Sequence, residues 1–481
     1  MGGNEVAAAG GFSLNVDAIR HQANAELDPK QKGALGQFMT PYIIAQFMAG
    51  LFNRTDAALL LDAGAGIGSL TMAASQVLRL ECVETWELDP VMVRYLKSNL
   101  ESLGVPFELH QKDFILDSVD RIQFGEGARF THAILNPPYK KISGDSVHRR
   151  ACQSLGLETG NLYTAFLALA ILQMQDLGEV VVIIPRSFCN GPYYRPFREL
   201  LLDKCSIDCI HVFESRDQAF KDDEVLQENI ILKLTCGGHQ ADVLLSTSVG
   251  ADFVDVTART VAFHAVVQPL DKDRFIRIPS HDLDGADNSA LFTHSLQDLG
   301  LQVSTGPVVD FRLKPWWSQD PQHGTVPCLY PHHFGPQGFE WPKAHKKPNA
   351  IFRSPEVDKW LMKSGIYVIV KRFSAKEERR RVVAYLVKPE DIPSDLVGFE
   401  NHWNVIHIRK GSLPLDLAKG MVMFLNSTVL DNYFRVFSGH TQVNATDLRN
   451  MKFPNLERLR LMGDSYNQCM PQGEIDALVG V

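Results

Sequence analysis

Short apolar runs alternate with amphipathic segments from residue 57 to about residue 234. The apolar runs have the length of buried strands, and the segments between them carry apolar residues at helical spacing. Strands are expected at residues 57–61, 82–88, 107–111, 133–135, 180–184, 207–213 and 229–234. Helices are expected at residues 69–78, 91–103, 162–174 and 194–202. This alternation predicts an α/β fold with a parallel, doubly wound sheet.

The pattern differs before and after this region. Residues 1–32 are small and polar, which predicts a loose tail. Thr40 is expected to cap a helix whose first residue is Pro41. Near residue 240 the alternation gives way to β-like stretches between loops rich in Pro, His and Trp. We therefore expect a domain at residues 33–240 and a second, mixed α+β domain at residues 241–481.

The composition of the chain is that of a globular protein. The chain has 481 residues, of which 45% are hydrophobic, and this is typical of a globular protein with two domains. It contains no apolar run of membrane-spanning length and no signal-peptide pattern, so a cytoplasmic protein without a membrane segment is expected. Its eight cysteines form no Cys-x-x-Cys pair. Reduced thiols and no metal site are therefore expected.

Polar residues follow successive predicted strands. The loop from Asp62 to Gly68, then Glu87, then Asp113 with Phe114, each come at a strand end. Ligands of doubly wound sheets bind beyond the carboxyl ends of the strands. The glycine loop lacks the third glycine of a dinucleotide motif, because position 69 is Ser. Asp62 at its start suits a ligand with an amino acid moiety rather than a pyrophosphate, so the loop favours a nucleotide-like ligand of this kind over a plain tight turn.

The tetrapeptide Asn136-Pro137-Pro138-Tyr139 follows the apolar run at residues 133–135. Two prolines fix the backbone and remove two donors, which leaves carbonyl groups, an amide and an aromatic ring at a stiff corner. This set suits a flat substrate that carries an amino group. A proline-stiffened strand exit, with Tyr139 as ordinary packing, explains the tetrapeptide by itself equally well.

Taken in order, these segments resemble the class I S-adenosylmethionine-dependent methyltransferases. More narrowly, they resemble the gamma-class N6-adenine DNA methyltransferases of bacterial restriction–modification systems. The resemblance covers about residues 33–240 and also includes Gly36-Gln37-Phe38-Met39-Thr40-Pro41 and the segment from Asn161 to Phe166. A cofactor loop that precedes the catalytic tetrapeptide, with a target-recognition region at the C-terminus, is the gamma arrangement.

The resemblance implies roles for individual residues. The cofactor S-adenosyl-L-methionine would be held by residues from the first motif, the glycine loop and the later strand ends: Gln37, Phe38, Thr40, Pro41, Asp62, Ala63, Gly64, Gly66, Glu87, Asp113, Phe114 and Asn136. Glu87 would bind the ribose, and Asp113 with Phe114 the adenine of the cofactor. Asn136 and Pro137 would accept both N6 hydrogens of a flipped-out adenine, beside Pro138 and Tyr139. Phe220 would stack on that base, with Phe213 as the competing assignment.

Double-stranded DNA is the partner that the resemblance implies, with a separately encoded restriction endonuclease and a monomeric enzyme. The net charge is −8, but residues 343–388 are rich in Lys and Arg. A DNA-facing role is expected for some of Lys371, Arg372, Arg379, Arg380 and Arg381.

Three alternatives stay open. The first is a methyltransferase for another amino or amide group, in RNA or in a protein glutamine. The second is a DNA-specificity module without catalysis. A cytosine N4 enzyme is less favoured, because Ser usually replaces Asn136 in that motif.

Overall fold

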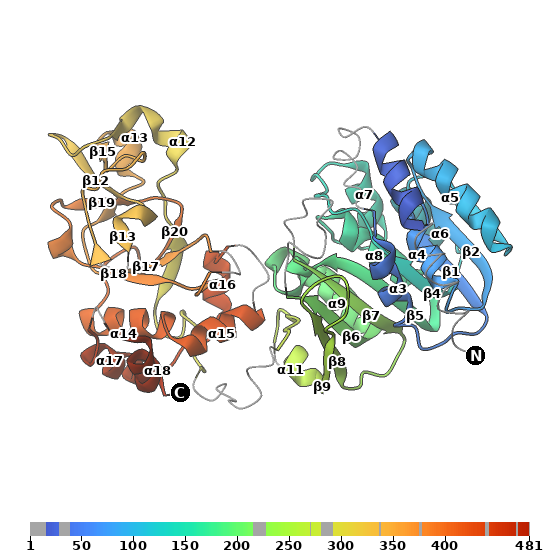
Figure 1. Cartoon of the computed structure of the whole chain (residues 1–481). Coiled ribbons are helices and arrows are strands. Elements are labelled where there is room, and N and C mark those ends of the chain that lie inside the picture. Colours follow the sequence, from blue (N-terminus) through green and yellow to red (C-terminus); the bar gives the residue numbers. More distant parts are fainter. Residues whose placement is uncertain are drawn as a thin grey trace. The chain divides into compact units, whose positions relative to one another are not determined.

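The computed structural model describes residues 16–27, 39–214, 228–269, 271–279, 292–335, 338–374, 378–437, 442–467 and 470–480. The chain divides into two compact units, Met1–Ile278 and Pro279–Val481 (Figure 1). The first unit has one sheet and the second has several, and each unit has its own buried apolar clusters. The two units are therefore described one at a time.

The first unit is built on a nine-stranded sheet in the order β3-β2-β1-β4-β5-β7-β6-β8-β9. Its strands are β1 (Ala58–Ala63), β2 (Leu80–Trp86), β3 (Phe107–His110), β4 (Phe130–Leu135), β5 (Met174–Pro185), β6 (Cys205–Phe213), β7 (Asn229–Cys236), β8 (Val243–Ser248) and β9 (Thr257–Val261). The pairs among β1 to β5 are parallel. β7 runs antiparallel to both of its neighbours, β5 and β6. The predicted α/β sheet is confirmed, with β7 and β9 as its antiparallel members.

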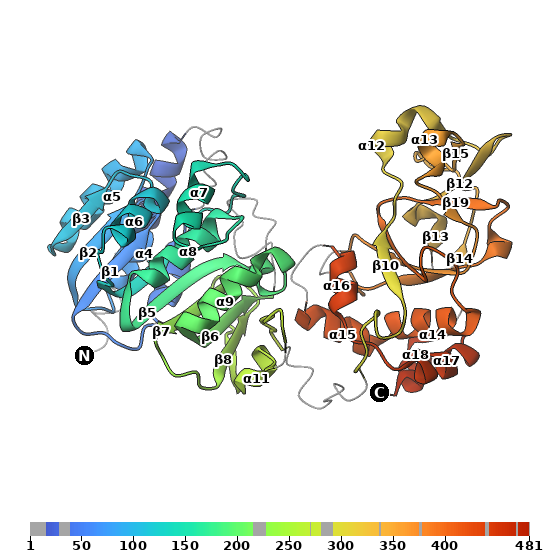
Figure 2. The same ribbon diagram turned by 180° about the vertical axis from the view of Figure 1, so that it is seen from behind.

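Helices cover both faces of this sheet (Figures 1 and 2). They are α3 (Tyr42–Ala49), α4 (Ser69–Ala74), α5 (Pro90–Leu103), α6 (Phe114–Gln123), α7 (Val147–Ser154), α8 (Leu162–Leu172) and α9 (Arg195–Lys204). Ile134 of β4 belongs to the apolar cluster of α3, α4 and α5, whereas its neighbour Leu135 belongs to the cluster of α6, α8 and α9. Successive strand residues point to opposite faces, so a run without polar residues is buried on both sides.

The first unit extends further along the chain than the sequence predicts. β8 pairs in parallel with β6, and β9 pairs antiparallel with β8, so both belong to the nine-stranded sheet of the first unit. The division falls between Ile278 and Pro279. The predicted boundary near residue 240 is wrong because Gly237 and Gly238 form a turn within the sheet and not a linker.

The second unit is mixed α+β, as predicted. A four-stranded antiparallel sheet has the order β10-β20-β17-β18, and a five-stranded sheet has the order β11-β15-β12-β19-β16. The first contains β10 (Gln302–Thr305), β17 (Tyr367–Lys371), β18 (Ala384–Val387) and β20 (Trp403–His407). The second contains β11 (Trp317–Ser318), β12 (Thr325–Leu329), β15 (Ala350–Phe352), β16 (Met362–Lys363) and β19 (Leu396–Phe399). The C-terminal helices are α14 (Leu415–Leu425), α15 (Thr428–Phe437), α16 (Ala445–Asn450), α17 (Leu456–Asp464) and α18 (Gln472–Val479).

The cysteines among the described residues form no disulfide bond. The Sγ atoms of Cys205 and Cys236 lie 3.2 Å apart across β6 and β7. Within the described part of the chain, no helix combines the length and the apolar character that a membrane span requires.

Helices α14 and α17 pack with their backbones in contact at two glycines. A Cβ atom on Gly420 would lie 1.7 Å from the carbonyl oxygen of Leu459. A Cβ atom on Gly463 would lie 1.8 Å from the carbonyl oxygen of Asp416. Because backbone atoms cannot move aside as a flexible side chain can, even one methyl group forces the helices apart.

The substitution Gly420→Ala is therefore expected to lower the free energy of unfolding by about 1–3 kcal/mol. Gly473→Ala in α18 is the control, since a Cβ atom there has no neighbour within 4 Å and alanine favours a helix. Denaturant unfolding of the full chain measures both variants. An unchanged midpoint for Gly420→Ala would show that α14 and α17 do not pack in this way.

Candidate active site

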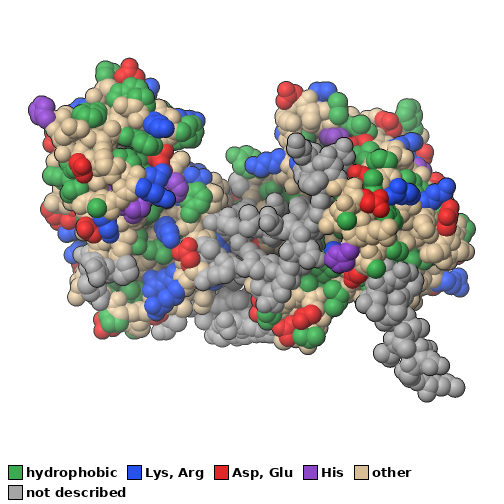
Figure 3. Space-filling view, turned by 45° about the horizontal axis from the view of Figure 1, so that its top comes forward, with side chains coloured by type: hydrophobic (Ala, Val, Ile, Leu, Met, Phe, Trp, Pro, Cys, Tyr) green, Lys and Arg blue, Asp and Glu red, His purple; other side chains and the backbone are tan. Residues whose placement is uncertain are grey.

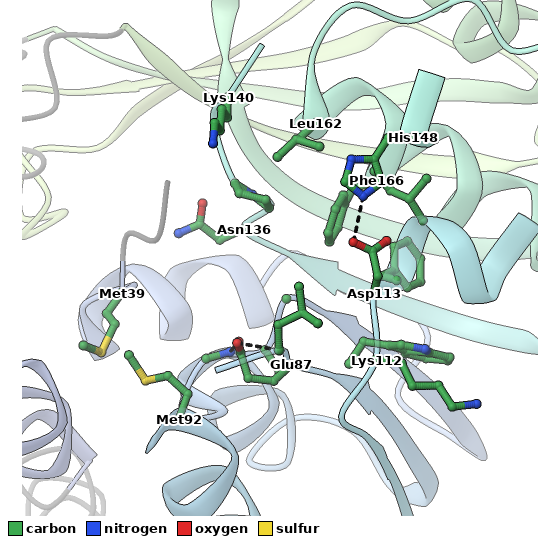
Figure 4. A pocket seen from close by; sticks show the side chains of 18 of the residues that line it. Met39, Glu87, Met92, Lys112, Asp113, Asn136, Lys140, His148, Leu162 and Phe166 are labelled. Carbon is green, nitrogen blue, oxygen red and sulfur yellow. Dashed lines mark hydrogen bonds and ion pairs between the residues drawn. The ribbon is translucent and has the colours of Figure 1, made fainter. Parts of the chain in front are cut away.

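A cavity of about 300 Å³ opens at the carboxyl edge of the first unit's sheet (Figure 4). Its volume is at the lower end of the range for small-molecule sites. Eight of the predicted site residues line it: Thr40, Gly64, Gly66, Glu87, Asp113, Phe114, Asn136 and Pro138. Residues from four strand ends thus meet around one space, as parallel strands require.

The remaining predicted residues fall into two groups. Some are described but do not line the cavity: Pro41, Asp62, Ala63, Pro137 and Tyr139. Others, namely Gln37, Phe38 and Phe220, lie outside the described residues.

The glycine loop needs its glycines for its backbone shape. Gly64, Gly66 and Gly68 have φ values of 73°, 57° and 85°, which side chains with a Cβ atom rarely adopt. A Cβ atom on Gly66 would have no neighbour within 4 Å, so this residue leaves space on the cavity side. The Gly64 N–H donates to the carbonyl of Trp86 at 2.9 Å, which fastens the loop to the end of β2.

Glu87 is buried and is oriented by backbone groups. Its Oε2 accepts a hydrogen bond from Gly66 N at 2.8 Å, and its Oε1 accepts from Leu88 N and Asp89 N, each at 2.8 Å. Burial raises the pKa of the Glu87 carboxyl, whereas these donors favour the charged form. The carboxylate therefore joins the glycine loop to β2 and faces the cavity in a fixed orientation.

Asp62 lies behind the loop and is completely buried. Its Oδ2 accepts from Thr71 Oγ1 at 2.7 Å, but its Oδ1 has no hydrogen-bond partner among the described residues. Burial raises the pKa of Asp62 to about 7, although the bond from Thr71 opposes this shift. At the other end of the glycine loop, the hydroxyl of Ser69 lines the cavity and is likewise buried without a partner among the described residues.

Asp113 has two partners of its own. It caps α6, where its Oδ1 accepts from Leu116 N at 3.0 Å, and its Oδ2 lies 2.8 Å from Nε2 of His148 (Figure 4). The ring of Phe114 is buried 4.9 Å from that of Phe166, and both rings line the cavity. This end of the cavity therefore offers a carboxylate, an imidazole and apolar ring faces.

Asn136 is held between two hydroxyl groups. Its Nδ2 donates to Thr40 Oγ1 at 2.9 Å, and its Oδ1 accepts from the hydroxyl of Tyr139 at 2.8 Å. The Tyr139 hydroxyl also lies 3.1 Å from the carbonyl oxygen of Ile183 on β5. Burial raises the pKa of Tyr139 far above its ordinary value, so this hydroxyl remains a donor at any physiological pH.

The structure corrects the predicted helix cap at Thr40. The N-cap of α3 is Pro41, and no side chain caps this helix. The hydroxyl of Thr40 instead accepts the hydrogen bond from Asn136. The Thr40 hydroxyl thus bonds to Asn136, which is distant in the sequence, and does not cap the helix.

His148 and Ser69 are two of the cavity residues that were not predicted from the sequence. His148 lies on α7, a mostly polar helix without an apolar pattern, so no signal placed it near Asp113. Ser69 was considered only as the residue that breaks a dinucleotide motif, and its position at the start of α4 could have suggested a role.

Phe213, the competitor for the base-stacking role, is a core residue. It is buried at the end of β6, with its ring 5.0 Å from that of His211 and 5.9 Å from that of Phe253. It therefore belongs to the packing between the sheet and its helices. Phe220 stays a prediction.

The basic segment of the second unit is largely paired within the protein. Arg381 is only 1% exposed, and its Nε donates to Ser374 Oγ at 3.2 Å, so its expected DNA-facing role is wrong. Lys371 forms an ion pair with Glu378 at 3.0 Å, and Arg372 donates to the carbonyl of Asn401 at 3.1 Å. Acidic and basic side chains are interspersed over the face shown in Figure 3.

One group of possible metal ligands occurs among the described residues, at Glu84, Glu108 and His110. The Glu84 carboxylate already forms ion pairs with Arg121 and with Arg129, the latter at 3.0 Å. Because two arginines already pair with the Glu84 carboxylate, we interpret Glu84, Glu108 and His110 as part of a structural ion-pair network and not as a metal site.

Comparisons with known proteins agree with these observations. A protein-family model described as Eco57I restriction-modification methylase matches residues 74–220. The chain is 47% identical to the Type II methyltransferase M.BsuBI of Bacillus subtilis, over 93% of each chain. It is 42% identical to the Type II methyltransferase M.PstI of Providencia stuartii, over 97% of each chain.

A solved structure supports the fold. The Type IIL restriction-modification enzyme MmeI in complex with DNA is similar with a TM-score of 0.53 at 11% identity, over 90% of this chain and 70% of that chain. The glycine loop, the strand-end acids and Asn136-Pro137-Pro138-Tyr139 occur in the order of the gamma arrangement. With near full-length identity above 40%, the chain belongs to the S-adenosylmethionine-dependent Type II DNA methyltransferases of restriction–modification systems.

Proposed function

We propose that this enzyme methylates N6 of an adenine within a specific sequence of duplex DNA. The observation that carries the proposal is the held amide of Asn136 at the end of β4, beside the cavity. Thr40 accepts from the amide nitrogen, so the amide oxygen is presented on the opposite side as an acceptor.

The two acceptors of Tyr139 support a role in receiving an amino group. A hydroxyl has one proton, so Tyr139 can donate to Asn136 Oδ1 or to the carbonyl of Ile183, but not to both. When it donates to Ile183, a substrate N–H can take the place of the Tyr139 hydroxyl as a donor to Asn136 Oδ1. The carbonyl of Pro137 then accepts the second hydrogen of the same amino group.

This pair of acceptors addresses the main chemical difficulty. The lone pair of an exocyclic amino group is delocalised into the ring, which makes the nitrogen a poor nucleophile. Two acceptors on its hydrogens favour a pyramidal nitrogen and stabilise the positive charge that develops during attack. A general base is not required before the attack. An asparagine at position 136 favours adenine N6 over cytosine N4.

The cavity fits the cofactor that the family uses. S-adenosylmethionine, when bound, supplies an electrophilic methyl carbon. The unpartnered buried oxygens of Asp62 and Ser69 suit its amino acid end, since a buried polar atom without a partner is costly. Glu87 is proposed to bind the ribose. Asp113 is proposed to bind the adenine amino group, with Phe114 against the ring.

DNA is proposed as the substrate because the relatives are named Type II methyltransferases and MmeI was solved in complex with DNA. A paired adenine is inaccessible, so it must leave the helix at a cost of a few kcal/mol. Stacking on aromatic side chains offsets about 1–3 kcal/mol per base. Tyr139 and Phe220 are proposed for this role.

The second unit is proposed to recognise the sequence, with the exposed Arg379 toward DNA. We further propose that the enzyme is a monomer and that its partner endonuclease is encoded separately.

The direct test is transfer of a tritiated methyl group from S-adenosylmethionine to duplex DNA, with analysis of the released nucleosides. The expected product is N6-methyladenine. Label only in RNA or protein would favour the alternative substrates, and label in cytosine would contradict the choice of base.

Asn136→Ala is expected to lower the rate of transfer by about 100-fold or more, because an acceptor used in the transition state is lost. Affinity for S-adenosylmethionine, measured by calorimetry, should change little. Tyr139→Phe is the matched control, since it keeps the ring and leaves the Asn136 oxygen accessible, and it should keep most of the activity. Near wild-type rates for Asn136→Ala would refute the acceptor mechanism.

Asp62→Asn tests the buried carboxylate. The pKa of Asp62 in the folded protein, about 7, is above its ordinary value of 3.8, so the unfolded chain binds fewer protons between these values. This group therefore lowers the free energy of unfolding as the pH rises toward 7. Without cofactor, Asp62→Asn should melt at a higher temperature than wild type at about pH 8, with a smaller gain at about pH 5.

The same variant should bind S-adenosylmethionine more weakly at about pH 8, because the negative charge behind the glycine loop, which attracts the cofactor's ammonium group, is lost. Thermal unfolding and calorimetric titration measure the two effects. A variant that is less stable at every pH and binds the cofactor normally would show that Asp62 is only structural.

A further inference from the structure

Asn229 is a buried amide without a hydrogen-bond partner. It is the first residue of β7 and is 4% exposed. Neither Nδ2 nor Oδ1 has a partner among the described residues. By contrast, the buried amides of Asn99 and Asn404 donate to backbone carbonyls, of Ile67 and Val443 respectively. Because buried amides are nearly always paired in proteins, one with both atoms unpaired calls for a ligand.

The register of the sheet places Asn229 at the functional edge. It pairs with Pro185, the last residue of β5, and the carboxyl end of β5 lies at the same edge as that of its parallel neighbour β4. Asn136 follows the end of β4 directly. Asn136 and Asn229 therefore lie at one edge, on strands separated only by β5.

Both asparagines also belong to the same face of the sheet. Ile134 and Ile231 share the apolar cluster that contains residues of α3. Asn229 is two residues before Ile231 in the same strand, so the two-residue alternation puts it on that face. Asn136 follows the last residue of β4, and its side chain is placed by its own contact. Consistently, Asn136 bonds to Thr40, which immediately precedes α3.

The separation suits a planar base between the two amides. Leu135 is opposite Val182 and Asn229 is opposite Pro185, so the two asparagines are staggered by two residues along the strands. Two strand spacings with this stagger amount to about 12 Å between the two Cα atoms. Two hydrogen bonds of about 3 Å, a purine ring between them and the length of the two side chains fit such a distance. An amide nitrogen at the far end can donate to a ring nitrogen, while Asn136 accepts from the amino group.

The backbone that carries Asn229 is fixed by the adjacent residues. Arg186 N donates to the carbonyl of Glu228 at 2.7 Å, and the two buried side chains form an ion pair at 3.4 Å. These contacts clamp the start of β7 against the exit of β5. A rigid support is what a residue that positions a substrate requires.

We propose that Asn229 binds the extrahelical target base, donating a hydrogen bond from its amide to a ring nitrogen; this rests on the proposed function. It would act with Asn136, which binds the amino group at the other end of the base. Asn229 would thereby distinguish a correctly seated adenine from a base that offers no acceptor at that position.

The test compares Asn229→Leu with wild type on a duplex that contains the recognition sequence. We expect kcat/KM for DNA to fall roughly 10- to 100-fold. The fluorescence of 2-aminopurine placed at the target position should show less flipped-out base at equal saturation. Affinity for S-adenosylmethionine should be unchanged, and the melting temperature should be equal or higher, since leucine leaves no unpaired amide.

Thr235→Val, at the other end of β7, is the matched control. Its hydroxyl donates to Asp208, so this variant should lose stability and keep kcat/KM for DNA. Wild-type kcat/KM and fluorescence in Asn229→Leu would overturn the inference, as would a parallel loss of cofactor affinity. If wild type itself transferred no methyl group to adenine, the proposed function would fail, which is a different result from an active wild type with an equally active variant.

Discussion

The amide of Asn136 depends on hydroxyl groups from two parts of the first unit. Thr40 reaches it from the residue before α3, and Tyr139 reaches it from the corner that follows β4. Tyr139 in turn contacts the carbonyl of Ile183 on β5. The acceptor is therefore in place only when α3, β4 and β5 are all packed correctly. The position of the Asn136 amide thus depends on the packing of the middle of the sheet.

The neighbouring strand ends carry acidic groups in an environment that disfavours charge. Burial raises the pKa of both Asp62 and Glu87, and Asp62 keeps one oxygen without a partner among the described residues. Such groups lower stability in the absence of a ligand, and a cationic or hydroxyl-bearing ligand offsets that cost. The same argument applies to the unpaired amide of Asn229. These buried polar groups therefore lower the stability of the fold at one edge of the sheet.

Much of the first unit could be predicted because buried strands are apolar and the polar residue after each strand marks one edge. Glu87, Asp113 and Asn136 were found in this way, and all line the cavity. His148 could not be found, since its helix is polar and its partner is distant in sequence. The boundary near residue 240 failed because strand pairing between β8 and β6 is a long-range contact.

We propose that the chain methylates adenine N6 at one DNA sequence. Long-read modification sequencing of DNA from cells with and without this gene is the most direct test. N6-methyladenine is expected at a single recurring sequence, present only in cells that carry the gene. N4-methylcytosine at such a sequence, or identical modification in both samples while the protein is produced, would contradict it.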